Sequence, residues 1–268
     1  MVNNLSLTFM VLSLILSLIL PIGGIIYLKK KYNASLKVFF IGVVAFFISV
    51  QILEGVIHNY VFNINNYTSN FLISNPIFYM LYGGLMAGIF EESARFISFK
   101  YLIKERDNVS AITYGVGHGG IESILIGFIG SINTIIYAVL INKGGFLNLL
   151  EAIGISKDII DTTYNQMINS PEITWLLPGL ERIMAIIIQI SLSVLVMQAI
   201  KNKKYIYYVL AIICHAIVDF PAALYQIGVL KNVYMVEGII LIITILIIVV
   251  IFNKFIKNKQ QFDNSLHF

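Results

Sequence analysis

Seven long apolar segments constrain the fold of this chain more than any other feature. They are Leu5–Leu28, Val38–Ile57, Pro76–Phe99, Ala111–Ile141, Trp175–Ile200, Tyr205–Tyr225 and Val233–Ile256. Because an α-helix rises about 1.5 Å per residue, about twenty residues cross the roughly 30 Å hydrocarbon core of a bilayer. Each segment is therefore predicted to be a transmembrane helix.

The composition agrees with a membrane protein and excludes an ordinary soluble domain. Of the 268 residues, 58% are hydrophobic and only 12% are charged, whereas a soluble domain has about 25% charged residues. Isoleucine, lysine and asparagine are abundant, which is typical of AT-rich bacterial genomes. We expect an all-α, polytopic transmembrane helical bundle, with residues 1–268 as a single domain of a multi-pass protein in a bacterial cell membrane. The lipid bilayer surrounds it, and no nucleic-acid partner is expected.

Basic residues between the segments predict the orientation in the membrane. Thirteen lie in alternate loops and after the last segment, and the other loops hold only Lys143, Lys157 and Lys231. The thirteen are Lys29, Lys30, Lys31, Lys37, Lys100, Lys104, Arg106, Lys201, Lys203, Lys204, Lys254, Lys257 and Lys259. Because cytoplasmic loops carry an excess of Lys and Arg, these thirteen are expected in the cytoplasm, with the N-terminus outside and the C-terminus inside. The long outer loop at residues 142–174 is expected to form a surface helix or a lid.

Three segments carry ionisable residues that would lie within the bilayer. They are Glu91, Glu92 and Arg95 in the third segment, His118 and Glu122 in the fourth, and His215 and Asp219 in the sixth. A charged side chain there costs at least about 2.5–3.5 kcal/mol on insertion scales, so such residues mark a functional site by default. In each segment, two of them are four residues apart and share one face of a helix.

The depths of these residues in the bilayer agree with one another. Glu92 lies 8 residues from Lys100, His118 lies 10 from Asn108, and His215 lies 11 from Lys204. These separations, measured from the expected cytoplasmic side, correspond to about 12, 15 and 16 Å along a helix. Three polar faces from three helices are therefore predicted to meet at one level in the membrane.

Such a group of side chains suits the hydrolysis of a peptide bond. A carboxylate in a poorly hydrated place can act as a general base on water. A histidine can donate a hydrogen bond to a developing oxyanion or bind a metal, and an aspartate one turn away can fix its orientation. The glycine-rich run Gly115–Gly120 around His118 is expected to let a substrate backbone approach closely, or to let the helix open to water.

The same residues resemble the motifs of the YhfC family of intramembrane metalloproteases. The motifs are Glu91-Glu92-x-x-Arg95, Gly117-His118-Gly119-Gly120-x-Glu122 and His215-x-x-x-Asp219. The family is similar to CAAX prenyl proteases, Abi-type bacteriocin-processing proteins and PrsW-type proteases. The resemblance implies an intramembrane peptidase that cuts a peptide or a membrane-protein segment, with a catalytic core at about residues 76–225.

The resemblance also implies roles for the motif residues. Water would be activated by Glu91 with support from Glu92 and Arg95. The water or the oxyanion would be positioned by His118 and His215, and Asp219 would hold His215 or a water. Whether a metal takes part is left open. Zinc is the candidate ion, with His118, His215 and Glu122 as candidate ligands, because imidazole and carboxylate groups are common zinc ligands.

Other functions stay open on the sequence alone. Intramembrane Glu, His and Asp side chains also build proton relays, so a proton-coupled transporter is a second hypothesis. A non-catalytic membrane protein of the bacteriocin-immunity type is a third. The polar pairs can also serve only for packing between helices. Near the outer ends of other segments, Glu54, Arg182 and Glu237 are expected to form an ion-pair cluster that is structural or acts as a gate. Gly84 and Gly88 are expected to lie on a helix-packing face.

Overall fold

The computed structural model describes residues 1–257, which contain helices and no strand. The all-α fold class is thereby confirmed. Six helical stretches are long and apolar enough to cross a membrane, or seven if a bent pair counts as one span. They follow the predicted segments closely: Asn4–Tyr32, Leu36–Ile64, the pair Asn66–Ser74 and Pro76–Leu102, Asn108–Lys143, Glu172–Lys201, Ile206–Gln226 and Val233–Phe255. The N-outside orientation stays a prediction, and Lys259 lies outside the described residues.

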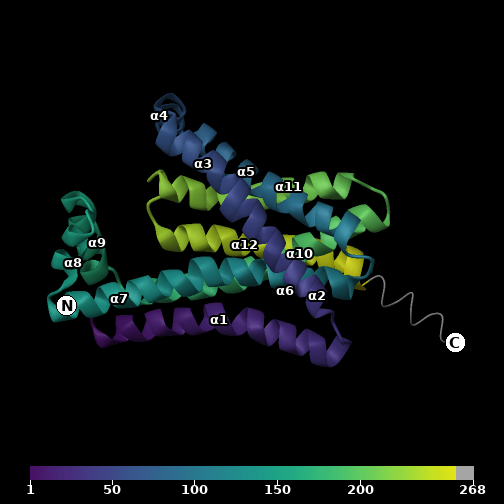
Figure 1. Cartoon of the computed structure of the whole chain (residues 1–268), viewed down its shortest axis with the longest axis horizontal. Helices are drawn as coiled ribbons and strands as arrows, with labels where there is room; N and C mark the ends of the chain where they lie inside the picture. Colours follow the sequence, from purple (N-terminus) through teal and green to yellow (C-terminus); the bar gives the residue numbers. More distant parts are fainter. Residues whose placement is uncertain (258–268) are drawn as a thin grey trace. The chain divides into compact units, whose positions relative to one another are not determined.

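Figure 1 shows the helices in chain order. They are α1 (Asn4–Tyr32), α2 (Leu36–Phe46), η1 (Phe47–Glu54), α3 (Gly55–Asn59), η2 (Tyr60–Ile64), α4 (Asn66–Ser74), α5 (Pro76–Ile97), η3 (Ser98–Leu102), α6 (Asn108–Glu122), η4 (Ser123–Phe128), α7 (Ile129–Lys143), α8 (Phe146–Ala152), α9 (Lys157–Asn169), η5 (Glu172–Leu176), α10 (Leu177–Lys201), α11 (Ile206–Gln226), α12 (Val233–Ile251) and η6 (Phe252–Lys257). The η segments are π-helix, except η5, which is a 3₁₀-helix. η1, η4 and η5 continue without a break into the next α-helix, whereas η2, η3 and η6 stand at the ends of their spans.

The third span is preceded by a short helix that the sequence did not predict. The side chain of Asn65 accepts hydrogen bonds from the backbone N–H groups of Tyr67 and Thr68 and so caps the start of α4. The chain then bends by 112° between α4 and α5. Pro76 stands at the first position of α5, where its missing N–H costs no helical hydrogen bond.

The chain divides into two compact units, Met1–Leu20 with Glu122–Ile183, and Pro21–Ile121 with the chain from Met184 onward. The expectation of a single membrane domain stays a prediction. In the first unit, the outer loop forms α8 and α9, which gather at the end of α7 (Figure 1). Their apolar faces are buried with the start of α1 in a small core of Val2, Met10, Ala138, Ile141, Phe146, Leu150, Ile160 and Met167. The loop thus forms two short helices, and its place on the membrane surface or as a lid stays a prediction.

In the second unit, α5 and α11 run side by side (Figure 1). A Cβ atom at Gly84 would lie 2.6 Å from the backbone oxygen of Ala216, and one at Gly88 would lie 2.7 Å from that of Ile212. Only glycine allows the two backbones to come this close, which confirms the predicted packing face. This contact brings the polar face of α5 against His215 on α11.

The glycines of α6 serve the same purpose against α10. A Cβ atom at Gly115 would lie 2.6 Å from the Cα atom of Ile190, and one at Gly119 would lie 3.0 Å from the Cβ atom of Gln189. The expectation that this run admits substrate or water was therefore wrong, because these faces are filled by a neighbouring helix. What the glycines provide is a close approach of α10 to His118.

Candidate active site

Four helices of the second unit bring their polar side chains together in one buried cluster. His118 Nε2 on α6 lies 2.9 Å from Glu91 Oε2 on α5. His215 Nδ1 on α11 lies 2.8 Å from Glu92 Oε1 on α5. All four side chains are buried. These two hydrogen bonds confirm that polar side chains of the three helices meet, while their depth in the membrane stays a prediction.

Arg95 occupies the centre of this cluster and is fully buried. Its guanidinium donates hydrogen bonds to Glu92 and to Gln189. The sequence pattern paired Arg95 with Glu91, four residues away, but the ion pair forms with Glu92, three residues away. Both spacings place the partners on one helix face, so spacing alone did not decide between them. A buried charge of this kind is tolerated because it is paired and hydrogen-bonded, although Arg95 Nε has no hydrogen-bond partner among the described residues.

Gln189 on α10 is the member of the cluster that the sequence analysis missed. It is buried, and its Nε2 atom donates to Glu91 Oε2 at 2.8 Å, while its side-chain oxygen accepts from Arg95. One amide thus links a carboxylate and a guanidinium of α5. Its signal in the sequence was an uncharged amide among apolar residues in the middle of the fifth span, which also holds Gln198 nearer its end. Such residues often form hydrogen bonds between membrane helices.

The ring of His118 is fixed by aromatic neighbours as well as by its hydrogen bond. Tyr114 stacks on it with ring centroids 5.6 Å apart, and Phe46 meets it edge to face at 5.1 Å. His118 is fully buried, so its Nε2 atom stays directed at Glu91. The imidazole and the carboxylate therefore act as one rigid pair.

The cluster opens toward solvent or lipid at Asp219. Its side chain is 36% exposed, against 8% for Glu91. Asp219 Oδ2 lies 3.6 Å from His215 Nε2, and Glu91 Oε1 lies 3.7 Å from the same nitrogen. These separations are longer than hydrogen bonds. Two carboxylate oxygens therefore face His215 Nε2, and neither is within hydrogen-bond distance of it.

Glu122 lies in the other unit, and its part in the site stays a prediction. Arg182 NH1 donates to Glu122 Oε1 at 2.9 Å, and Arg182 also pairs with Glu181. Glu122 therefore has a basic partner sixty residues away in the chain, which the spacing of four from His118 did not reveal.

Two members of the expected outer cluster of Glu54, Arg182 and Glu237 have ionisable partners outside that cluster. These two are Glu54 and Arg182. Glu54 Oε1 lies 3.0 Å from His58 Nε2, whose Nδ1 lies 2.9 Å from the hydroxyl of Tyr82. Arg182 has its carboxylate partners within its own unit. A gate formed by all three stays a prediction.

The donor types of the buried cluster would suit zinc, since two imidazoles and several carboxylates are present. Within residues 1–257, however, no three His, Cys, Asp or Glu side chains are arranged so as to hold a metal ion. The Nε2 atoms of His118 and His215 each face a different oxygen of Glu91. The side chains as they stand do not fit a bound ion.

Comparisons with known proteins agree on one family. A sequence model described as YhfC intramembrane metalloprotease matches residues 16–240. The chain is also 41% identical over 247 residues to the membrane protein YhfC of Bacillus subtilis (strain 168), a match that covers 92% of this chain and 95% of that protein. No solved structure matches the chain. The span of the family match includes every member of the buried cluster.

Proposed function

This chain belongs to the YhfC intramembrane metalloprotease family, and from that premise we propose that it is an intramembrane peptidase of a bacterial cell membrane. It hydrolyses a peptide bond in a peptide or membrane-protein substrate, with Glu91 as the general base. The observation that carries the proposal is the buried Glu91–His118 pair, held between two helices at 2.9 Å. Buried ionisable pairs of this kind are rare in membrane helices and mark functional sites.

Glu91 is suited to activate water because its two oxygens differ. Oε2 accepts hydrogen bonds from His118 and Gln189, which fix the carboxylate in place. Oε1 faces His215 Nε2 at 3.7 Å, beyond hydrogen-bond range. Among the described residues no hydrogen bond occupies Oε1. A water molecule bound there would be held by a base whose orientation is already set.

The reaction proceeds by addition of this water to the scissile carbonyl carbon. Glu91 takes a proton from the water as its oxygen bonds to that carbon, and the carbonyl oxygen becomes an oxyanion. His215 Nε2 donates a hydrogen bond to the oxyanion. The C–N bond then breaks, and the proton on Glu91 passes to the departing amine nitrogen. The products are a carboxylic acid and an amine, Glu91 returns to its ionised form, and the acid proton passes to the amine to give a carboxylate and an ammonium group.

The remaining members of the cluster position these two groups. Glu92 accepts from His215 Nδ1 at 2.8 Å, which turns the Nε2 atom toward Glu91 and Asp219. Arg95 pairs with Glu92 and compensates its buried charge. Asp219, at the exposed edge of the cluster, is placed to orient the incoming water or the His215 ring.

The test compares new protein termini in membranes of bacterial cells that lack their own copy of this protein. Cells express the wild type, Glu91→Gln, or the control Glu105→Gln, which changes an exposed glutamate outside the cluster. Mass spectrometry of chain termini detects cleavage in any membrane protein or peptide, so the substrate does not have to be chosen in advance.

We expect a set of new termini in membrane proteins or peptides with the wild type and with Glu105→Gln. Glu91→Gln should lose them, because an amide cannot accept the proton of water, while its amount in the membrane stays the same. The proposal is wrong if the wild type produces no additional termini, or if Glu91→Gln produces the same set.

A further inference from the structure

An apolar groove lies on the second unit, on the side of α5 that faces away from the buried cluster. It has a volume of about 610 Å³ and is lined by α2 and η1 on one side and by α5 and η3 on the other. Ser93, Ala94 and Ile97 of α5 face the groove. Glu91 and Arg95 belong to the opposite face of that helix, since residues on one face recur every three or four positions. The groove is therefore separate from the candidate active site.

The groove begins at one membrane surface and runs inward. Lys37 stands in the first turn of α2, and Leu102 is the last residue of η3, so both mark the ends of spans. From Leu102 to Ile89, the lining covers fourteen residues of helix, whose ends are roughly 20 Å apart along the axis. One leaflet of the hydrocarbon core is about 15 Å thick. The groove is thus about as long as one leaflet with its headgroup region.

The walls offer no hydrogen bonds to an occupant along most of this length. Large apolar side chains such as Phe40, Val44 and Ile97 are about half exposed there. The three serine hydroxyls in the lining are already engaged: Ser49 with the backbone of Ala45, Ser98 with the backbone of Ala94, and Ser93 with the hydroxyl of Tyr208. An extended peptide would leave its backbone groups unpaired, which is costly in an apolar medium.

The size of the groove also argues against a helical peptide. One turn of α-helix with side chains is about 10–12 Å wide and 5.4 Å long, or roughly 500 Å³. The groove would hold little more than one such turn. A hydrocarbon chain is narrow and has no polar groups to satisfy, so it matches both the volume and the walls.

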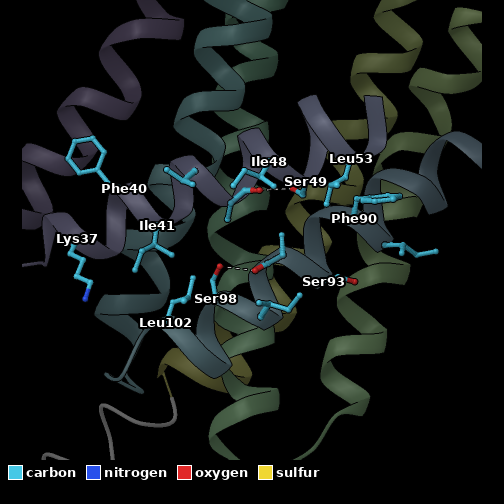
Figure 2. Close-up of a pocket in the computed structure, with 15 residues that line it drawn as sticks. Lys37, Phe40, Ile41, Ile48, Ser49, Leu53, Phe90, Ser93, Ser98 and Leu102 are labelled. Carbon is cyan, nitrogen blue, oxygen red and sulfur yellow. Dashed lines mark hydrogen bonds between the residues drawn. The ribbon is translucent and has the colours of Figure 1, made fainter. Parts of the chain in front are cut away.

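Charge appears in the lining at one end alone. Figure 2 shows Lys37 at one edge of the set of lining residues, with Phe90 and Ser93 at the other side. Lys37 is exposed. An occupant that is apolar along its length and negatively charged at the membrane surface complements this pattern.

We propose that the groove between α2–η1 and α5–η3 binds one anionic phospholipid, with an acyl chain against Val44 and Ala94 and its phosphate at Lys37. The proposal does not depend on the peptidase activity. A basic side chain near the membrane surface attracts an anionic lipid by about 1 kcal/mol, which corresponds to about fivefold in affinity.

The test is native mass spectrometry of the purified full chain with added phosphatidylglycerol or phosphatidylcholine of identical acyl chains. We expect the wild type to retain one phosphatidylglycerol in preference to phosphatidylcholine. Lys37→Glu should lower that preference at least about fivefold. The control Lys204→Glu removes an equally exposed lysine that does not line the groove, and it should leave the preference unchanged.

A second pair of variants tests the acyl chain. Val44→Trp fills the groove from an exposed position and should lower binding of both lipids, whereas Val209→Trp, at an exposed position outside the lining, should not. Equal effects of the two charge variants, or undiminished binding by Val44→Trp, would overturn the proposal.

A measurement on the unmodified chain covers the case in which a variant does not fold. Phosphatidylglycerol with a photoreactive acyl chain should label residues of α2, η1 or α5 that line the groove. Labelling confined to other helices would also overturn the proposal that the groove binds a phospholipid.

Discussion

The amide of Gln189 makes two contacts that can be separated by substitution. Gln189→Glu keeps an oxygen for Arg95 but replaces the N–H group that donates to Glu91 at 2.8 Å. A hydrogen bond to a charged group contributes about 1.5–3 kcal/mol. If this bond fixes Glu91 for proton transfer, the cleavage rate should fall about 10- to 150-fold. The new carboxylate beside Glu91 adds like-charge repulsion in the same direction.

Stability should respond differently from activity in this series. Gln189→Glu preserves the partner of Arg95 but loses the hydrogen bond to Glu91, so it should destabilise the protein less than Gln189→Leu. Gln189→Leu removes both contacts and leaves a buried guanidinium N–H without an acceptor, which costs about 1–3 kcal/mol more. Folded protein is measured as the fraction that stays monodisperse in detergent after heating, and activity as the cleavage rate of a reporter peptide built from a site found in the terminus analysis.

The matched control is Gln198→Glu. Gln198 is also a buried amide on α10, but it donates to Asn108 at 3.3 Å, outside the cluster. The Gln198→Glu variant should cleave the reporter peptide at the wild-type rate. Wild-type activity in Gln189→Glu, or an equal loss in both variants, would refute the role given to Gln189.

Two further predictions concern the packing that supports the site. Arg95→Ala removes one of the two partners of the buried Glu92 carboxylate, the other being His215. It should destabilise the protein by about 3–5 kcal/mol, measured as the fraction monodisperse after heating, and a loss below about 1 kcal/mol would contradict the buried ion pair. Gly88→Ala places a Cβ atom 2.7 Å from the backbone oxygen of Ile212 and should cost about 1–3 kcal/mol in the same assay. Its control is Gly130→Ala, where a Cβ atom meets nothing within 4 Å, and equal stability of these two variants would show that α5 and α11 are not in close contact.

The spans and the meeting of three polar faces were predictable because both depend on simple regularities. Apolar length sets the spans, and a spacing of four residues sets which side chains share a face. Equal depth then indicated which faces would meet, and the contacts of Glu91 with His118 and of Glu92 with His215 agree. Each of these inferences uses the sequence of one helix at a time, together with the depth of its residues below the same membrane surface.

The partners across helices were not predictable in the same way. Gln189 carries no charge, and it reaches Glu91 only because Gly119 on α6 lets α10 come close. The partner of Glu122 is Arg182, which depends on how distant segments are arranged rather than on spacing. The glycines beside His118 looked like a substrate passage, but in the structure they are contact points between helices.

The central claim, that Glu91 activates water for peptide hydrolysis, is tested most directly by an oxygen-label experiment. The purified full chain in lipid nanodiscs cleaves the reporter peptide in ¹⁸O-water, and the new C-terminus is weighed by mass spectrometry. We expect one ¹⁸O atom in each new carboxylate with the wild type and no product with Glu91→Gln. Product without the label, or labelled product from Glu91→Gln at the wild-type rate, would contradict the account.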